Sequence, residues 1–120
     1  MKIAITSTGN ELNSDMDPRF GRAQYYIIYD IDHDEIMEII NNNDNMNASG
    51  GAGTSAAQII AAKGAEAVIS GNFGPNATKG LTGFGIKMFQ SEVKKIDMVI
   101  ADYKAKKLNI VSNATVAGHH

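Results

Sequence analysis

Cysteine is absent from this chain of 120 residues. Its absence excludes disulfide bonds, a thiol nucleophile and thiolate metal ligands. The chain also has no apolar run close to the ~20 residues of a membrane-spanning helix, and its first residues show no signal-peptide apolar region or cleavage site. We therefore expect a protein that stays in the cytoplasm and holds any metal without thiolates.

An excess of charge of one sign is also missing. The formal net charge is -2, and there is no long basic run. Sites for a nucleic-acid backbone gather lysine and arginine on one face. The one cationic cluster, Lys104, Lys106 and Lys107, lies near the end of a predicted helix, where lysines meet the negative end of the helix dipole. We expect neither nucleic acid nor a membrane as a partner.

The apolar pattern predicts one domain of alternating strands and helices. Strands are predicted over residues 2–6, 24–31, 35–40, 67–70 and 86–89, and helices over residues 54–63, 76–81 and from Ser91 to Tyr103. The second and third strands predict a hairpin with His33 at its tip. The order β-β-β-α-β-α-β-α predicts an α/β fold with a mixed five-stranded sheet and flanking helices. We expect one domain over residues 1–108 and an irregular tail over residues 109–120.

Residues 17–23 (Asp-Pro-Arg-Phe-Gly-Arg-Ala) place two arginines around a Phe-Gly turn. Arginine offers five donors in a rigid fork and stays charged, which suits an anion clamp. A surface turn with solvated charges explains the same residues, and in that interpretation Asp17 simply pairs with Arg19 or Arg22. The remainder of the chain must decide between these two interpretations.

Three turns lie where a parallel sheet collects its ligands, beyond the carboxyl ends of its strands. They span residues 7–10, 50–54 and 71–75. If the first strand and the strand at 67–70 are neighbours, all three share one crevice with the arginine segment. The glycine-rich start of the helix at 54 supplies N–H groups for an anion, although a plain helix start explains these glycines equally well. Neither of the common glycine-rich nucleotide-binding motifs is present.

Metal ligands other than thiolates are few. Met16 and Met46 lie in two crevice loops, where a thioether can touch a metal or a sulfide, but methionine more often fills gaps in a core. His119 and His120 end the chain and are also weak candidates, with a tag remnant or a free tail as the alternative. No histidine or lysine is placed to activate a nucleophile, so we expect no catalysis.

Taken in order, several motifs resemble one family. They are Lys-Ile-Ala-Ile in the first strand, a Ser-x-Gly turn, the arginine segment at 17–23, Gly-Ala-Gly-Thr at 51–54 and Gly-Asn-Phe-Gly-Pro-Asn-Ala at 71–77. The chain resembles the dinitrogenase iron-molybdenum cofactor biosynthesis family, which includes the NifX-like carriers and the C-terminal domain of NifB. The resemblance implies a ribonuclease H-like fold. It also implies a non-catalytic protein that binds an iron-sulfur or molybdenum-containing sulfide cluster and hands it to an assembly or acceptor protein.

The resemblance and the turns together give the expected cluster-binding residues. These are Ser7, Gly9, Arg19, Phe20, Gly21, Arg22, Gly51, Gly53, Thr54, Asn72 and Gly74. Nitrogenase-associated members tend to have histidine where this chain has Arg19, which favours holding an anion by charge. An oxyanion-binding, nucleotide-binding or partner-binding adaptor without metal is the alternative. A ribonuclease H-type enzyme needs acidic residues on core strands, and the first strand has Ile3, Ala4 and Ile5 instead.

Overall fold

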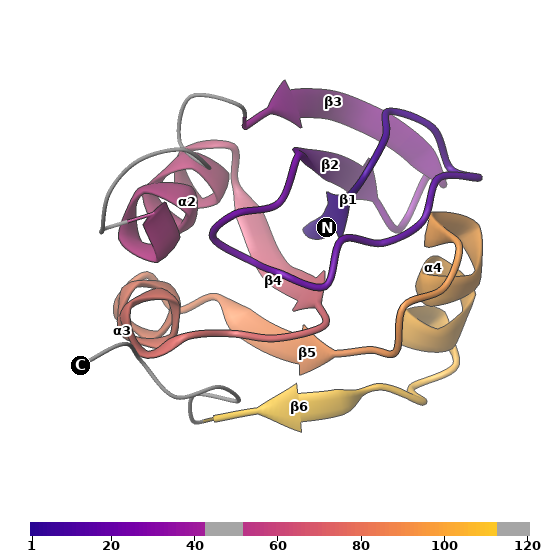
Figure 1. Ribbon diagram of the computed structural model, residues 1–120. Coiled ribbons are helices and arrows are strands. Elements are labelled where there is room, and N and C mark those ends of the chain that lie inside the picture. The colour runs from indigo at the N-terminus through magenta and orange to yellow at the C-terminus, as the bar shows by residue number, and fades with distance from the viewer. Residues whose placement is uncertain (43–51, 113–120) are drawn as a thin grey trace.

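A six-stranded mixed sheet forms the centre of the protein (Figure 1). The computed structural model describes residues 1–42 and 52–112. The strands are β1 (Lys2–Ser7), β2 (Tyr25–Asp30), β3 (Glu35–Asn41), β4 (Ala65–Ser70), β5 (Lys87–Gln90) and β6 (Asn109–Val111), in the spatial order β3-β2-β1-β4-β5-β6. β1, β4 and β5 are parallel, whereas β2, β3 and β6 pair antiparallel with their neighbours.

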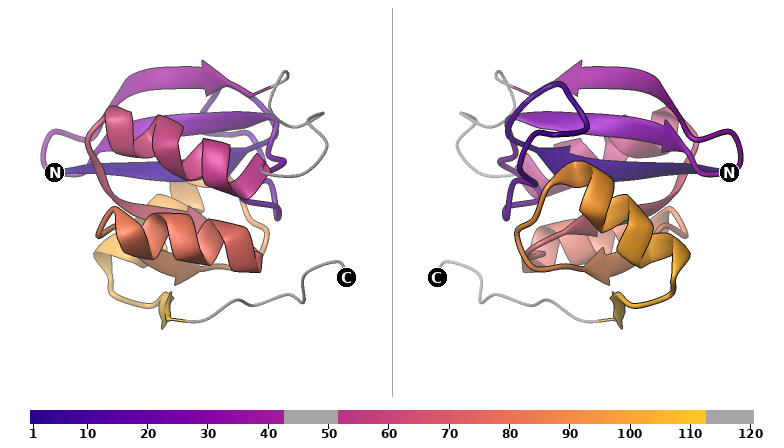
Figure 2. Two further views of the ribbon diagram at one scale, coloured as in Figure 1. Left: turned by 90° about the vertical axis from the view of Figure 1, so that its left-hand side faces the viewer. Right: turned by 90° about the vertical axis from the view of Figure 1, so that its right-hand side faces the viewer.

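Helices cover both faces of this sheet. α2 (Ala52–Ala62) and α3 (Pro75–Gly83) lie side by side on one face, and α4 (Ile96–Lys104) lies on the other (Figures 1 and 2). β1 supplies both cores because successive side chains point to opposite faces of a strand: Ala4 joins the core under α2 and α3, while Ile3 and Ile5 join the core under α4. Within the described ranges, no helix is long and apolar enough to cross a membrane.

The predicted α/β class is confirmed, and each of the five predicted strands lies within two residues of an observed one. The count of five is wrong because β6 adds a sixth strand at the edge of the sheet. Asn109–Val111 is short and lies beside β5, with Ile110 exposed. A strand of this kind has no alternation of apolar and polar residues from which it could be predicted. These three residues therefore belong to the sheet and not to an irregular tail. The ribonuclease H-like classification stays a prediction.

The start of α4 differs from the prediction, which placed it at Ser91. The backbone N–H of Ser91 instead donates to the carbonyl of Ser70 over 3.1 Å, and the helix begins at Ile96. The N–H groups of Ile96 and Asp97 donate to the carbonyls of Ser14 and Leu12, both over 2.9 Å. A distant loop thus satisfies the first donors of the helix, a contact that local sequence cannot reveal.

The predicted hairpin is confirmed as the antiparallel pair of β2 and β3. His33 lies exposed at its tip, and its Nδ1 lies 2.9 Å from a carboxylate oxygen of Asp30. This hydrogen bond raises the pKa of His33 above its ordinary value. The histidine therefore holds the turn through a local pair.

Candidate functional site

The segment that carries both arginines is folded tightly onto the end of β4. The N–H of Phe20 donates to the carbonyl of Asn72 over 3.3 Å, and Arg19 and Asn72 form a parallel bridge. Gly71 is required for this approach, because a Cβ there would lie 2.9 Å from the carbonyl oxygen of Pro18. The loop is therefore a fixed part of the fold, held by backbone contacts.

A buried carboxylate organises the same loop. Asp17 is 1% exposed, and its oxygens accept hydrogen bonds from the N–H of Arg19 at 3.0 Å and the N–H of Gln24 at 3.2 Å. The first of these is the turn that Asp-Pro sequences favour. The Nε of Arg19 lies 3.4 Å from the same carboxylate, which confirms the predicted pairing of Asp17 with Arg19.

The side chain of Arg19 is only partly engaged by the protein. Its side chain is 54% exposed, and among the described residues Asp17 alone pairs with it, through Nε. The two Nη groups are the donors best suited to a planar or multi-oxygen anion. Arg22 is exposed in the same loop. The loop thus presents guanidinium groups at its surface while its backbone is anchored below.

Phe20 anchors the loop and belongs to the core. Its side chain is 2% exposed, with ring centroids 5.7 Å from Tyr26 and 5.6 Å from Phe73. The predicted role of Phe20 in contacting a ligand is therefore wrong for its side chain. Its contribution is to fix the position of the arginine on each side of it.

A polar network beneath the loop turns its carbonyl groups inward. The hydroxyl of Tyr26 donates to the carbonyl of Phe20, and Nδ2 of Asn42 donates to the carbonyls of Ala23 at 2.9 Å and Gly21 at 3.4 Å. Burial raises the pKa of Tyr26, so its hydroxyl stays a neutral donor. These oxygens, which would repel an anion, are thereby satisfied inside the protein.

Sequence reasoning missed both members of this network. Tyr26 sits in an aromatic, β-branched strand and is indistinguishable there from a residue that only packs. Asn42 lies at the start of an asparagine-rich stretch, where turn formers are common. The signal that could have found them is chemical: a buried tyrosine hydroxyl or asparagine amide needs partners, and a nearby loop with exposed backbone supplies them.

Two helix N-termini meet beside the arginine loop. A Cβ at Gly53, in the first turn of α2, would lie 2.9 Å from the backbone nitrogen of Ala77, in the first turn of α3. α3 begins after Gly74, which makes no side-chain capping bond, and a Cβ at Gly74 would have no atom within 4 Å. The first N–H groups of a helix carry a partial positive charge. The first turns of α2 and α3 therefore lie in contact with each other, and the start of α3 at Gly74 is open to solvent.

The structure brings together one group of the predicted site residues. β1 and β4 are parallel neighbours, as the shared crevice requires. Arg19 bridges Asn72, which lies two residues before Gly74, and the first turn of α3 touches Gly53 next to the exposed Thr54. The arginine loop and the N-terminal ends of α2 and α3 share one end of the molecule (Figure 2). We call this group the arginine site.

Another group of predicted residues faces α4 instead. The hydroxyl of Ser7 donates to the carbonyl of Gly9 over 2.7 Å, and Gly9 lies against Ser14, so this turn is occupied by its own contacts. Met16 is 0% exposed and packs among the apolar residues under α4. Residues 12–14 of the loop that follows β1 contact the start of α4, and a crevice shared by residues 7–10 with the other turns stays a prediction.

The remaining predicted residues lie elsewhere. Gly21 is half-buried within the arginine loop. Gly51, Met46, His119 and His120 lie outside the described residues. In residues 1–42 and 52–112, no three side chains of histidine, cysteine, aspartate or glutamate gather as metal ligands. The donors that gather at the arginine site are guanidinium and backbone N–H groups, which bind anions.

Comparison with known proteins identifies the family. The family model of the dinitrogenase iron-molybdenum cofactor matches residues 1–106. An uncharacterized protein of Methanocaldococcus jannaschii is 36% identical over 110 residues, covering 90% of this chain and 89% of its relative.

Two solved structures share the fold closely. The apo form of the orange protein from Desulfovibrio gigas has a TM-score of 0.91 at 30% identity, covering 96% of both chains. A Thermotoga protein described as a proposed NifB protein of the DUF35 family has a TM-score of 0.85 at 31% identity, covering 98% of both chains. The chain therefore belongs to the dinitrogenase iron-molybdenum cofactor family.

Proposed function

We propose that this protein is a non-catalytic carrier that binds an iron-sulfur or molybdenum-containing sulfide cluster as cargo at the arginine site. One observation supports the proposal most: the backbone of Arg19 bridges Asn72, which lies just before α3, and the Arg19 side chain is 54% exposed. Family membership makes a metal-sulfur cluster the cargo to consider first. The cargo passes from an assembly protein to an acceptor.

The donor set suits such a cargo. Metal-sulfide clusters are compact anions, and guanidinium and N–H groups can hydrogen-bond to their outer sulfur atoms without a bond to each metal. The chain has no cysteine that could ligate the metal. Binding through the outer atoms favours release, because no metal-thiolate bond has to break. A carrier needs this property.

The same donors also fit a small oxyanion, so an adaptor that binds an oxyanion, a nucleotide or a partner protein without metal is the second candidate. Calorimetry with phosphate, molybdate and a nucleoside triphosphate separates the two. A cluster carrier should not bind the nucleoside triphosphate strongly.

Anaerobic reconstitution with iron, molybdate and sulfide tests the cluster proposal. After gel filtration we expect a coloured complex whose metal and sulfide contents are fixed multiples of the protein concentration. The double variant Arg19→Ala/Arg22→Ala should lose most of the bound cluster. Added salt should weaken binding by the parent protein, because screening reduces attraction between exposed charges.

The double variant Lys87→Ala/Lys107→Ala is the matched control. It removes the same charge from two exposed lysines outside the arginine site. Full binding by this control together with loss in the arginine variant supports the proposal. Equal loss in both variants would show that net charge alone attracts the cluster, and colourless protein under every condition would overturn the carrier function.

A further inference from the structure

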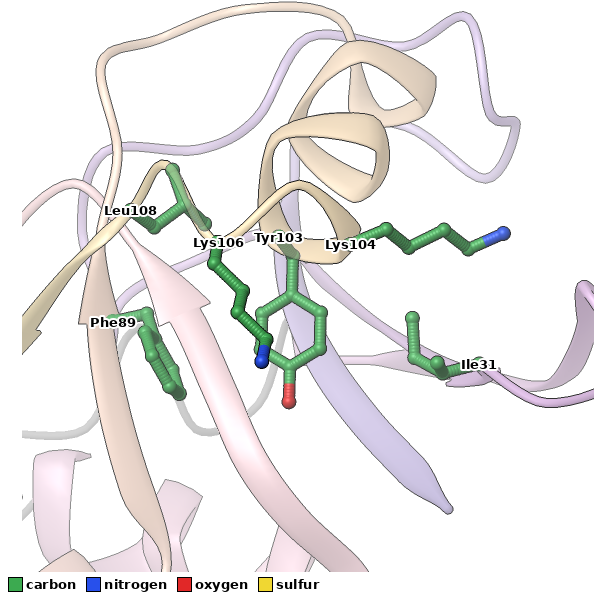
Figure 3. Close-up of a pocket in the computed structure, with 6 residues that line it drawn as sticks. All are labelled: Ile31, Phe89, Tyr103, Lys104, Lys106 and Leu108. Carbon is green, nitrogen blue, oxygen red and sulfur yellow. The ribbon is translucent and has the colours of Figure 1, made fainter.

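A pocket lies on the α4 side of the sheet, away from the arginine site. Its volume is about 490 Å³, and its lining residues are Ile31, Phe89, Tyr103, Lys104, Lys106 and Leu108 (Figure 3). They come from the residue after β2, from β5 and from the last turn of α4 with the segment that follows it. Pockets of roughly 300–1,000 Å³ hold most small ligands. We call it the α4 pocket.

The interior of the α4 pocket is apolar and aromatic. The rings of Phe89 and Tyr103 meet edge to face with centroids 5.1 Å apart, and both side chains are only partly buried. Ile110 pairs directly with Phe89 across β5 and β6, which places the two side chains on the same face, and Ile110 is 65% exposed. Apolar surface thus continues from the pocket to the sheet edge.

Lys104 and Lys106 are the charged residues of the pocket lining, and the nearby carboxylate of Glu66 helps to raise the pKa of Tyr103, after the larger effect of burial. Lys104 forms an ion pair with Asp34, and the two charges of that pair neutralise each other. The ammonium of Lys106 has no ion pair with any described residue, and its side chain is among those that line the pocket (Figure 3). One amine at the rim is therefore available to a ligand.

The backbone at Lys106 is unusual for a residue with a side chain. Its φ is 59°, the left-handed conformation in which glycine normally follows a helix. The N–H groups of Lys106 and Lys107 donate to the carbonyls of Tyr103 and Asp102 over 3.1 and 2.9 Å. These bonds satisfy carbonyl oxygens that would otherwise repel an anion at the helix end. Glycine would relieve the backbone here but would remove the ammonium from the pocket.

We propose that the α4 pocket binds a small amphipathic anion, with an aromatic group against Phe89 and Tyr103 and an acidic group at Lys106. The apolar interior accounts for the first part and the unpaired ammonium for the second. Neither part uses the arginine site, so the two proposed sites are tested independently of each other. The ligand class is an aromatic organic acid.

A pair of fluorescent probes tests the proposal directly. 8-Anilinonaphthalene-1-sulfonate carries an acidic group, and N-phenyl-1-naphthylamine has the same rings without it. We expect saturable binding of the sulfonate at one site, with Lys106→Gln weakening it roughly tenfold, as for the loss of one charge-assisted hydrogen bond. The uncharged probe should bind Lys106→Gln and the parent equally. Lys107→Gln, which removes an equal charge outside the lining, should change neither affinity.

Two further variants separate binding from folding. Lys106→Gly should melt at the same or a higher temperature than the parent and still bind the sulfonate as weakly as Lys106→Gln. Leu108→Trp should reduce the affinity of both probes by filling the pocket. A melting curve that matches that of the parent shows that this variant is folded. Unchanged sulfonate affinity in both Lys106 variants, or binding without saturation, would overturn the proposal.

Discussion

Replacing the buried carboxylate of Asp17 should destabilise the protein strongly. In Asp17→Ala the N–H groups of Arg19 and Gln24 lose an acceptor at 3.0 and 3.2 Å. Hydrogen bonds to charged groups contribute about 1.5–3 kcal/mol each. The 3.4 Å contact to Nε belongs to a half-exposed side chain and adds at most about 1 kcal/mol. Allowing for partial rehydration of the two amides, we expect a loss of about 3 kcal/mol.

Urea unfolding followed by circular dichroism measures this loss. A domain of ordinary stability, about 5–15 kcal/mol, would remain folded but show a clearly lower midpoint. Asp15→Ala is the control, because Asp15 is exposed and its 3.1 Å pair with Lys95 lies at the surface. We expect that variant to lose less than about 1 kcal/mol.

Asp17→Asn refines the test. The amide keeps one oxygen acceptor but turns an NH2 group toward the second N–H donor. The free energy of unfolding of Asp17→Asn should therefore lie between those of the parent and Asp17→Ala. A loss below about 1 kcal/mol in Asp17→Ala would refute the reasoning, because it would show that the carboxylate does not hold the arginine loop.

Two other predictions concern the helix contact and the hairpin turn. Gly53→Ala should cost about 1–3 kcal/mol in urea unfolding, because its Cβ would lie 2.9 Å from the nitrogen of Ala77. Gly74→Ala should change stability by less than about 0.5 kcal/mol, because its φ is -79° and no atom lies within 4 Å; equal effects of the two would contradict the described contact. The Asp30 hydrogen bond raises the pKa of His33, so its stabilising effect is present below the unfolded pKa of about 6.5 and is lost as pH rises through the folded value. An NMR titration should give a pKa above 6.5 that falls in Asp30→Asn, and an unchanged value would contradict the pair.

Most of the fold could be predicted because its strands carry strong local patterns. β1 is buried on both faces and forms a continuous apolar run, and the hairpin of β2 and β3 has polar turn residues between aromatic and β-branched strands. β6 could not be predicted, since three residues with an exposed Ile110 depend on the neighbouring β5 for their structure. The start of α4 was misplaced for a similar reason, because its first donors bind carbonyls of a distant loop.

The residue types of the arginine loop predicted an anion site, which stays a prediction. The structure adds that the backbone of Arg19 pairs with Asn72, shortly before α3 begins. The direction of Phe20 and Met16 could not be predicted, because both lie in one loop and enter cores on opposite faces of the sheet. Only tertiary packing decides which apolar residue of a loop is buried and where.

The most direct test of the proposed function is an amide NMR map of cluster binding. The 15N-labelled protein is titrated anaerobically with the cluster reconstituted from iron, molybdate and sulfide. We predict that the perturbed or broadened amides include those of Arg19, Arg22, Gly53, Asn72 and Ala77, while those around the α4 pocket keep their positions. Saturable binding that perturbs other amides and leaves these five unchanged would contradict the arginine site as the place where this protein holds its cargo.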